Sequence, residues 1–291
     1  MQEMMDTMDI AFPNLGIYLE NVPQSFSVFG FDIYLYAVVI AIGGVLGIHM
    51  AEWAAKVNKM NPDDVWDFAF IAVPCSIVGA RLYYVVFEWD NFKGNLISVF
   101  NMREGGLAIY GAVIVAFLTL FIYCKVRKQN PFRLGECGVQ GLILGQILGR
   151  WGNFFNREVF GGYTDNLLAM RIPLDAVRDS TDITQAIQDH VAEGTNYIQV
   201  HPTFIYESLL NLVLLVLMIV WHRRKKFNGE ICLLYLGGYG IIRFFIEGIR
   251  TDQLKLPGTS IAVSQMLGIV LFVVALGAEL AIRYGLKKKS E

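Results

Sequence analysis

Long apolar stretches alternate with short polar segments along most of the chain. Several windows of about 20 residues are nearly free of charge, and this is the length that a helix needs to cross the hydrocarbon core of a membrane. The pattern predicts spans at about 28–51, 65–87, 105–124, 134–151, 203–221, 231–248 and 261–282. The second is the least regular, because it contains Pro74 and Arg81. We therefore predict an all-α integral membrane protein with about seven transmembrane helices.

Lys and Arg collect in segments that a seven-span topology places on one side of the membrane. Loop 125–133 holds four basic residues and no acidic one, RRKK lies within 222–230, and the chain ends in RYGLKKKSE. The long loop 152–202 is acidic by contrast, with seven Asp or Glu against three Arg. Because basic loops collect in the cytoplasm, we predict a cytoplasmic C-terminus, an N-terminus outside, and a small extracytoplasmic head at 152–202.

This topology divides the chain into five parts. An N-terminal extracytoplasmic segment (1–27) precedes the first four spans (28–151), and the head loop (152–202) separates them from the last three spans (203–283) and a basic tail (284–291). The first 25 residues contain no Lys or Arg, so they lack the basic region of a signal peptide and are expected to be retained. Within the head, DITQAIQDHVAEG predicts a short helix, and TNYIQVHP predicts an extended segment.

Composition agrees with a membrane protein and excludes other classes. The chain is 55% hydrophobic and 17% charged, whereas soluble proteins carry about a quarter of charged residues. Its four cysteines form no CxxC pair and lie in or beside the spans, which favours buried thiols over metal or disulfide roles. The net charge is −2, and no basic stripe alternates with aromatic residues, so no nucleic-acid surface is predicted.

The segment 149–162, GRWGNFFNREVFGG, places Arg150, Asn153, Asn156, Arg157 and Glu158 directly after an apolar, glycine-spaced run. Charged and amide side chains at membrane depth are expensive and usually serve function. The alternative is an ordinary turn that ends a helix, which two glycines and two asparagines would also allow. Gly141, Gly145 and Gly149 precede it at intervals of four, a spacing that lets a neighbouring helix approach closely.

A second polar group lies in the sixth span. Tyr239, Arg243, Glu247 and Arg250 are spaced i, i+4, i+8 and i+11 and share one helix face. The alternative is an ion pair that only joins helices. The excess of positive charge favours an anionic ligand, and a guanidinium binds phosphate oxygens in a bidentate manner.

Three further motifs complete the candidate chemistry. HPTFIYES places His201 just before the fifth span, REGGLAIYGA places Tyr110 after a Gly-Gly pair, and GARLYYV contains Arg81. A histidine at a helix start is more often a cap than a catalyst, and the tyrosines of the first span fit an aromatic belt. The predicted topology brings the strongest groups to the outward half of the membrane, which indicates either lipid head-group chemistry or transport.

These motifs together resemble the prolipoprotein diacylglyceryl transferases of bacterial inner membranes. GRWGNFFNREVFGG resembles the signature of that family, HPTFIYES is similar to its HPTQLYES, and REGGLAIYGA, GARLYYV and YGIIRFFIEGIRTDQ match further blocks in the same order. The matching blocks span about residues 30–270. The resemblance implies transfer of the sn-1,2-diacylglyceryl group from phosphatidylglycerol to the lipobox cysteine of a prolipoprotein, with release of glycerol-1-phosphate. It also implies no metal or soluble cofactor, and an active site towards the outer leaflet of the bacterial cytoplasmic membrane.

The resemblance also implies which residues act. The candidate catalytic residues are Tyr36, Tyr110, Glu158, Arg243 and Glu247, and the candidate substrate-binding residues are Arg81, Arg150, Asn153, Asn156, Gly161, His201, Tyr239 and Arg250. Several family members have histidine where this chain has Tyr110, and a tyrosine of ordinary pKa near 10 is a poor base at neutral pH. The base is therefore open between Tyr110, Glu158 and Glu247.

Overall fold

The computed structural model describes residues 5–102, 105–256, 258–259 and 261–290, and it is mostly helical. The long helices are α1 (Leu35–Val57), α2 (Asp63–Phe87), α3 (Ile109–Val126), α4 (Pro131–Asn156), α6 (Thr203–His222), α7 (Glu230–Ile249) and α8 (Val263–Ser290). Within the described residues, six of them are long and apolar enough to cross a membrane, all except α4. Helix α4 covers the predicted span 134–151 but carries more polar residues, including Arg133, Glu136 and Arg150. The prediction of a helical membrane protein is confirmed, but the all-α class is wrong, because the described residues also form strands in two small sheets.

The start predicted for the first span, at about 28, is wrong. Residues 25–34 form a hairpin of β3 (Ser25–Val28) and β4 (Phe31–Tyr34), and helix α1 begins only at Leu35. Phe29 and Gly30 both have positive φ, 51° and 82°, which is the backbone that a two-residue hairpin turn requires. The apolar run therefore continues from a strand into a helix, and hydrophobicity alone does not mark the boundary.

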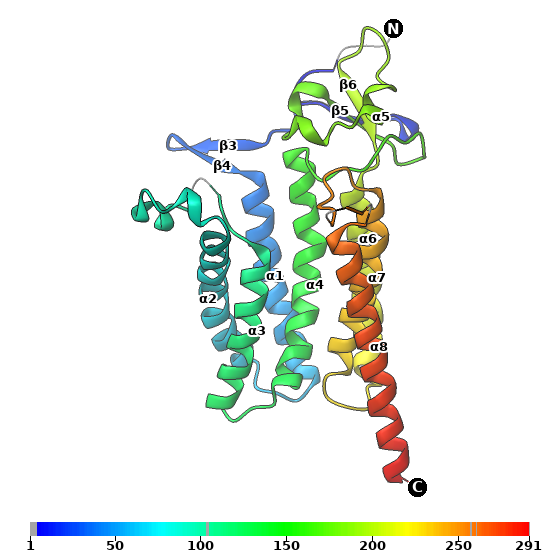
Figure 1. The fold of residues 1–291 in the computed structure, drawn as a ribbon. Helices are drawn as coiled ribbons and strands as arrows, with labels where there is room; N and C mark the ends of the chain where they lie inside the picture. Colours follow the sequence, from blue (N-terminus) through cyan, green and yellow to red (C-terminus); the bar gives the residue numbers. More distant parts are fainter. Residues whose placement is uncertain (1–4, 103–104, 257, 260, 291) are drawn as a thin grey trace. The chain divides into compact units, whose positions relative to one another are not determined.

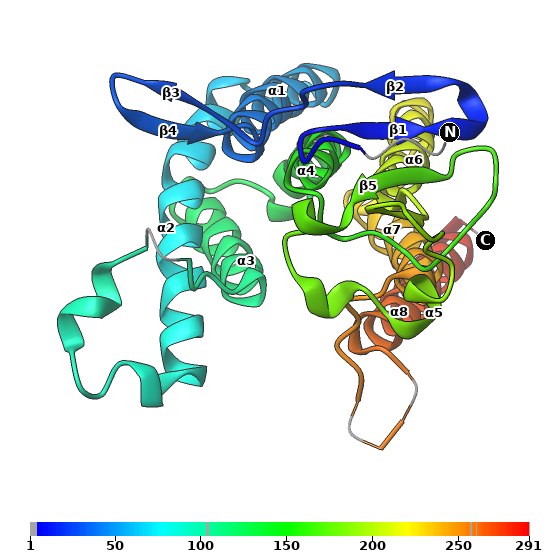
Figure 2. The same ribbon diagram turned by 90° about the horizontal axis from the view of Figure 1, so that it is seen from above.

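A four-stranded antiparallel sheet covers one end of helices α4, α6 and α7 (Figures 1 and 2). Its order is β2 (Ile17–Leu19), β1 (Ile10–Phe12), β5 (Met170–Pro173) and β6 (Tyr197–Val200). The short helix α5 (Gln185–Gln188) and the one-turn helices η1 (Pro13–Leu15), η4 (Leu174–Ala176) and η5 (Ser180–Asp182) complete this layer. We call residues 5–22 and 157–201 the cap.

The cap has an apolar core that continues into the helices below it. Strand residues Ile10, Ile172 and Ile198 are almost fully buried and pack with Phe154 of α4 and Phe204 of α6. The predicted extended segment is found as β6, whereas only Gln185–Gln188 of the predicted cap helix is helical. Pairing of β1 with β5 joins the N-terminal segment to the 157–201 loop, a contact that no local pattern predicts.

Contacts divide the chain into two units. In the unit that contains the cap, Gly43 and Gly47 of α1 face Gly145 and Gly141 of α4 so closely that an added Cβ on Gly47 would lie 2.7 Å from the Gly141 carbonyl oxygen. Small residues allow this approach, so the predicted packing role of Gly141 and Gly145 is confirmed. An added Cβ on Gly149 would meet nothing within 4 Å, so the prediction for Gly149 is wrong.

The second unit comprises residues 48–139 and 227–229, with α2, α3 and the one-turn helices η2 (Trp89–Asn91) and η3 (Leu96–Phe100). Helix α2 passes through Pro74 without ending. Helices α2 and α3 cross closely at Gly79 and Gly111, where an added Cβ on Gly79 would lie 2.9 Å from the Gly111 carbonyl oxygen. Cys124 and Cys137 are buried, as predicted, whereas Cys75 and Cys232 are only half-buried.

Candidate active site

The polar segment 149–162 spans the end of α4 and the chain reversal that follows it. Helix α4 ends at Asn156, and Arg157 and Val159 both adopt positive φ. Arg157 is 2% exposed and donates to the carbonyls of Phe155, Met8 and Val22 at 3.0, 3.0 and 2.7 Å. Burial lowers the pKa of Arg157. This arginine therefore fastens the N-terminal segment to the motif rather than facing a ligand.

Glu158 is the acceptor at the centre of the motif. Its Oε1 accepts from the side-chain amides of Asn153 and Asn156 at 3.0 and 3.1 Å. Its Oε2 accepts from Arg178 of the cap, with which it forms an ion pair. Two amides and one guanidinium thus orient the carboxylate.

Arg150 and Arg243 converge on one buried carboxylate, Glu207 of α6. Arg150 Nη2 lies 2.8 Å from Glu207 Oε1 and forms an ion pair with it, although the geometry is not that of a hydrogen bond. Arg243 Nη1 donates a hydrogen bond to Glu207 Oε2 at 3.3 Å. Glu207 is 1% exposed. Helices α4, α6 and α7 each supply one charge, so the two guanidiniums are held side by side by a shared counter-ion.

Glu247 and Arg250 extend this group along α7. Arg243 Nη2 donates to Glu247 at 2.5 Å, the i,i+4 contact expected from the sequence. Arg250 lies 3.7 Å from Glu247 and forms a bidentate pair with Asp252, at 2.8 and 2.5 Å. Two arginines therefore share Glu247, which is 3% exposed.

Two tyrosines border these charges. Tyr239 of α7 stacks on Tyr235 with ring centroids 5.6 Å apart, and its phenol lies beside Arg150, Arg243 and Glu207. Tyr36, in the first turn of α1, packs against the backbone of α4, because an added Cβ on Gly152 would lie 2.6 Å from its ring. The charges of Glu158, Arg150 and Arg178 all act on its phenol.

Gly161 and His201 connect the motif to the ends of two helices. The Gly161 N–H donates to the His201 carbonyl at 2.9 Å, and the Gly162 N–H donates to the Ile249 carbonyl at 3.1 Å. The imidazole Nδ1 of His201 lies 3.2 Å from the hydroxyl of Tyr206. Burial lowers the pKa of His201 below its usual value, so its ring is neutral at pH 7.

The arrangement is a nearly neutral network of opposite charges. We call it the arginine–carboxylate cluster, and its members are Arg150, Arg178, Arg243, Arg250, Glu158, Glu207, Glu247 and Asp252. Each guanidinium has a carboxylate partner in the described structure. An anionic ligand must therefore replace or share a carboxylate in order to reach an arginine.

Tyr110 and Arg81 belong to the other unit. Tyr110 lies in the first turn of α3, is 42% exposed, and has its ring 6.4 Å from that of Tyr83. Arg81 is buried and donates to five backbone carbonyls, those of Ser98, Val99, Asn101, Gly105 and Gly106. These bonds use all five donors of a guanidinium, so a substrate contact would have to replace one of them. Arg103 and Glu104 of the same motif lie outside the described residues.

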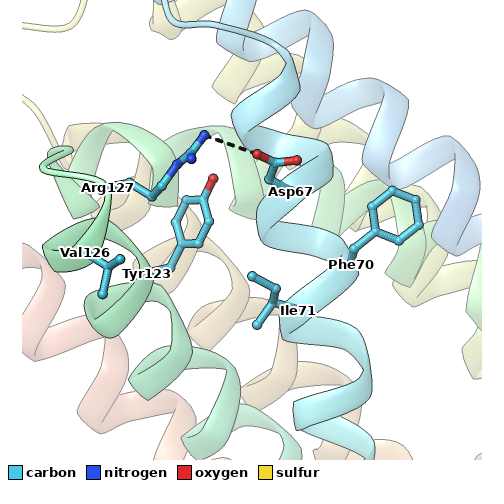
Figure 3. Close-up of a pocket in the computed structure, with 6 residues that line it drawn as sticks. All are labelled: Asp67, Phe70, Ile71, Tyr123, Val126 and Arg127. Carbon is cyan, nitrogen blue, oxygen red and sulfur yellow. Dashed lines mark hydrogen bonds and ion pairs between the residues drawn. The ribbon is translucent and has the colours of Figure 1, made fainter.

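Other ligand sites in the described chain are limited. No group of three His, Cys, Asp or Glu side chains within the described ranges could hold a metal ion. A pocket between α2 and α3 is lined by Asp67, Phe70, Ile71, Tyr123, Val126 and Arg127, with Arg127 Nη2 3.2 Å from Asp67 Oδ2 (Figure 3). None of these residues is a candidate from the sequence.

Comparison with known proteins agrees with the motifs. Residues 23–280 match the family model described as "Prolipoprotein diacylglyceryl transferase". The chain is 40% identical over 253 residues to the phosphatidylglycerol–prolipoprotein diacylglyceryl transferase of Clostridium botulinum (strain Langeland), covering 86% of this chain and 94% of that protein. It is 39% identical over 261 residues to the protein of that name from Finegoldia magna, covering 89% and 94%. The chain belongs to the prolipoprotein diacylglyceryl transferase family.

In this member of the family, the structure brings together most of the candidate residues and adds three. Glu207, Arg178 and Asp252 complete the ion pairs but were not among the candidates from the sequence. Glu207 carried a usable signal, because a carboxylate inside an apolar helix is rarely idle. Arg178 lies in an irregular loop and carried none.

Proposed function

We propose that the chain transfers the sn-1,2-diacylglyceryl group of phosphatidylglycerol to the lipobox cysteine thiol of a prolipoprotein, forming a thioether and releasing glycerol-1-phosphate. The observation that carries this proposal is the pairing of Arg150 and Arg243 through buried Glu207, in a chain of this family. A phospholipid phosphate is an anion that the bilayer itself supplies, and guanidiniums bind it in bidentate geometry.

In this mechanism Arg150 and Arg243 hold the donor phosphate. Their charge stabilises the phosphate as it becomes the leaving group. Asn153 and Asn156 lie three and six residues beyond Arg150 in α4 and would orient the glycerol and phosphate oxygens, while Tyr36 and Tyr239 border the bound head group. The acceptor thiolate attacks the glyceryl C3 carbon, and holding sulfur and carbon together supplies much of the rate.

Among the three candidate bases, Glu158 has the most favourable geometry. Glu247 is less accessible, because its side chain is only 4% exposed against 14% for Glu158, and Arg243 and Arg250 both contact its Oε2. Tyr110 lies in the other unit of the chain, with its ring beside that of Tyr83. Glu158 Oε2 has only Arg178 as its ion-pair partner among the described residues. We assign it to accept the thiol proton.

We also propose that α4 crosses the membrane, which gives seven spans. Strands β1 and β5 pair in one sheet, so the chain must leave and return to the same side between residues 12 and 170. The candidate spans α1, α2 and α3 make three crossings, and α4 supplies the fourth. The basic loops then lie opposite the cap. This arrangement makes the cap the extracytoplasmic head, places the cluster towards the outer leaflet of the cytoplasmic membrane, and retains the five-part division at 27, 151, 202 and 283.

Replacing Arg243 tests the function. We expect Arg243→Ala to reduce transfer at least 10²- to 10³-fold, since loss of one charge-stabilising donor costs this much, while the protein remains folded. Transfer is measured with labelled phosphatidylglycerol and a lipobox peptide, and the product is identified by the mass added to the peptide cysteine. Arg127→Ala is the control, because Arg127 is half exposed and pairs with Asp67 within the other unit of the chain.

Two outcomes would count against the proposal. Undiminished transfer by Arg243→Ala would remove the assigned role of this arginine. A wild-type preparation that moved phosphatidylglycerol between leaflets but added no mass to the peptide would make the protein a lipid transporter instead.

A further inference from the structure

Arg178 differs from the other arginines of the cluster in its position in the fold and in the exposure of its side chain. It lies in the cap between η4 and η5, whereas Arg150, Arg243 and Arg250 lie on or directly after helices α4 and α7. Its side chain is 62% exposed, against 20%, 15% and 12% for those three. Its carboxylate partner Glu158 is only 14% exposed.

This difference decides which ion pair an incoming anion opens most easily. Glu207 and Glu247 are almost fully buried, so taking away one of the two arginines that each contacts leaves a buried charge less compensated, which is unfavourable. An ion pair with an exposed guanidinium contributes little to stability, because water solvates the arginine when the pair opens. Glu158 keeps the amides of Asn153 and Asn156 after such a change. Exchange of partners therefore costs least at Arg178.

Arg178 is also placed to meet the head group. Its charge and that of Arg150 both act on the phenol of Tyr36, so both arginines lie near this tyrosine. Further along the same segment, Asp182 is influenced by Asp252, Arg250 and Glu158. Residues 178–182 thus run along the edge of the cluster.

We propose that Arg178 is a donor-binding residue that leaves Glu158 for the phosphate of the lipid. This inference rests on the proposed function and names a third guanidinium for the same substrate. Donor binding then frees Glu158 Oε2 at the moment when a base is needed. The acceptor S–H bond breaks and its proton moves to Oε2. The thiolate forms the S–C3 bond, the C3–O bond breaks with its electron pair going to the phosphate oxygen, and glycerol-1-phosphate leaves with the proton from Glu158.

Steady-state kinetics separate this role from a structural one. In Arg178→Gln we expect the KM for phosphatidylglycerol to rise about tenfold, the size expected for one lost charge-assisted hydrogen bond. The KM for the lipobox peptide should stay the same, and Arg178→Lys should recover part of the loss. Arg171→Gln is the matched control, since Arg171 is a cap arginine that bonds Gln199 at 2.8 Å and stacks on Tyr197.

The exchange itself is tested by Glu158→Gln, measured as phosphatidylglycerol binding to the purified protein. Without a carboxylate to release, Arg178 is free, so this variant should bind the lipid more tightly than wild type while losing turnover. Adding Arg178→Gln should abolish the gain. Unchanged or weaker lipid binding by Glu158→Gln, or an unchanged lipid KM in Arg178→Gln, would overturn the inference. If wild type itself forms no thioether product, the proposed function fails rather than the role of Arg178.

Discussion

Gly161 occupies a position where the backbone approaches two other segments too closely for a side chain. An added Cβ would lie 2.7 Å from the carbonyl oxygen of Ile249 and 2.8 Å from Cβ of His201. The first of these contacts is backbone, which cannot rotate away. Gly161 therefore aligns the motif with the end of α7, where Glu247 and Arg250 lie.

We expect Gly161→Ala to lower activity at least tenfold and to lower the thermal unfolding temperature, because overpacking of this size costs about 1–3 kcal/mol. Gly162→Ala is its control, since an added Cβ there meets nothing within 4 Å. The measurement is transfer rate and unfolding temperature of both purified variants. Equal behaviour of the two variants would show that the close approach at Gly161 is unimportant.

Two neighbouring aspartates of the cap should respond to pH with opposite sign. Burial, with the charges of Asp252 and Asp179, raises the pKa of Asp182. A raised pKa in the folded state means that the contribution of Asp182 to stability is greatest below about pH 4, its unfolded value, and falls as the pH rises through the folded pKa. Hydrogen bonds from the side chain and backbone of Thr181 lower the pKa of Asp179, whose contribution is present above about pH 4 and is lost at lower pH.

Asp182→Asn should therefore raise the unfolding temperature at pH 7, and Asp179→Asn should lower it. Both differences from wild type should shrink at pH 4, where the unfolded aspartates take up protons. Unfolding temperatures of the three proteins at the two pH values check this. A gain for Asp182→Asn that is equally large at both pH values would rule out titration as its cause.

At the scale of single elements, the hydrophobic pattern predicts the long helices well but does not predict the hairpin that precedes α1. Helices occur at every predicted span, because an uninterrupted apolar run of this length has few other stable forms in a membrane. The β3–β4 hairpin was missed because Phe26, Phe31 and Ile33 are as apolar as the helix that follows. The Arg243–Glu247 pair was predictable from i,i+4 spacing within one helix.

The close packing of α1 on α4 leads to a prediction about these two helices. Gly47→Leu would push the two helices apart, because the Cβ atom of the new side chain would already lie 2.7 Å from the carbonyl oxygen of Gly141. We expect a lower unfolding temperature, and reduced transfer because α1 carries Tyr36 and α4 carries Arg150. Gly44→Leu, one turn away on the same helix, is the control, since its added Cβ meets nothing within 4 Å. Equal unfolding temperatures for both variants would contradict the packing argument.

At the scale of the whole molecule, the site depends on contacts between segments far apart in sequence. Glu207 meets Arg150 and Arg243 only because α4, α6 and α7 pack together, and Glu158 meets Arg178 only because the cap folds back over α4. No spacing pattern in the sequence predicts either of these contacts, because the residues lie on different segments. The sequence identified most of the charged groups, whereas their partners required the fold.

The same long-range pairing makes the topology testable with two single-cysteine variants. After replacement of the four native cysteines, Glu193→Cys places a thiol in the cap, and Lys128→Cys places one in the basic loop between α3 and α4; both sites are exposed. If α4 crosses the membrane, a maleimide that cannot enter cells should label Glu193→Cys in intact cells and Lys128→Cys only after permeabilisation. If α4 stays on one side, both positions share that side and label alike. Since β1 and β5 form one sheet, that result would also require one of α1, α2 or α3 not to span. The opposite labelling pattern would keep seven spans but place the cap and its cluster in the cytoplasm, where the secreted lipobox cysteine could not reach Glu158.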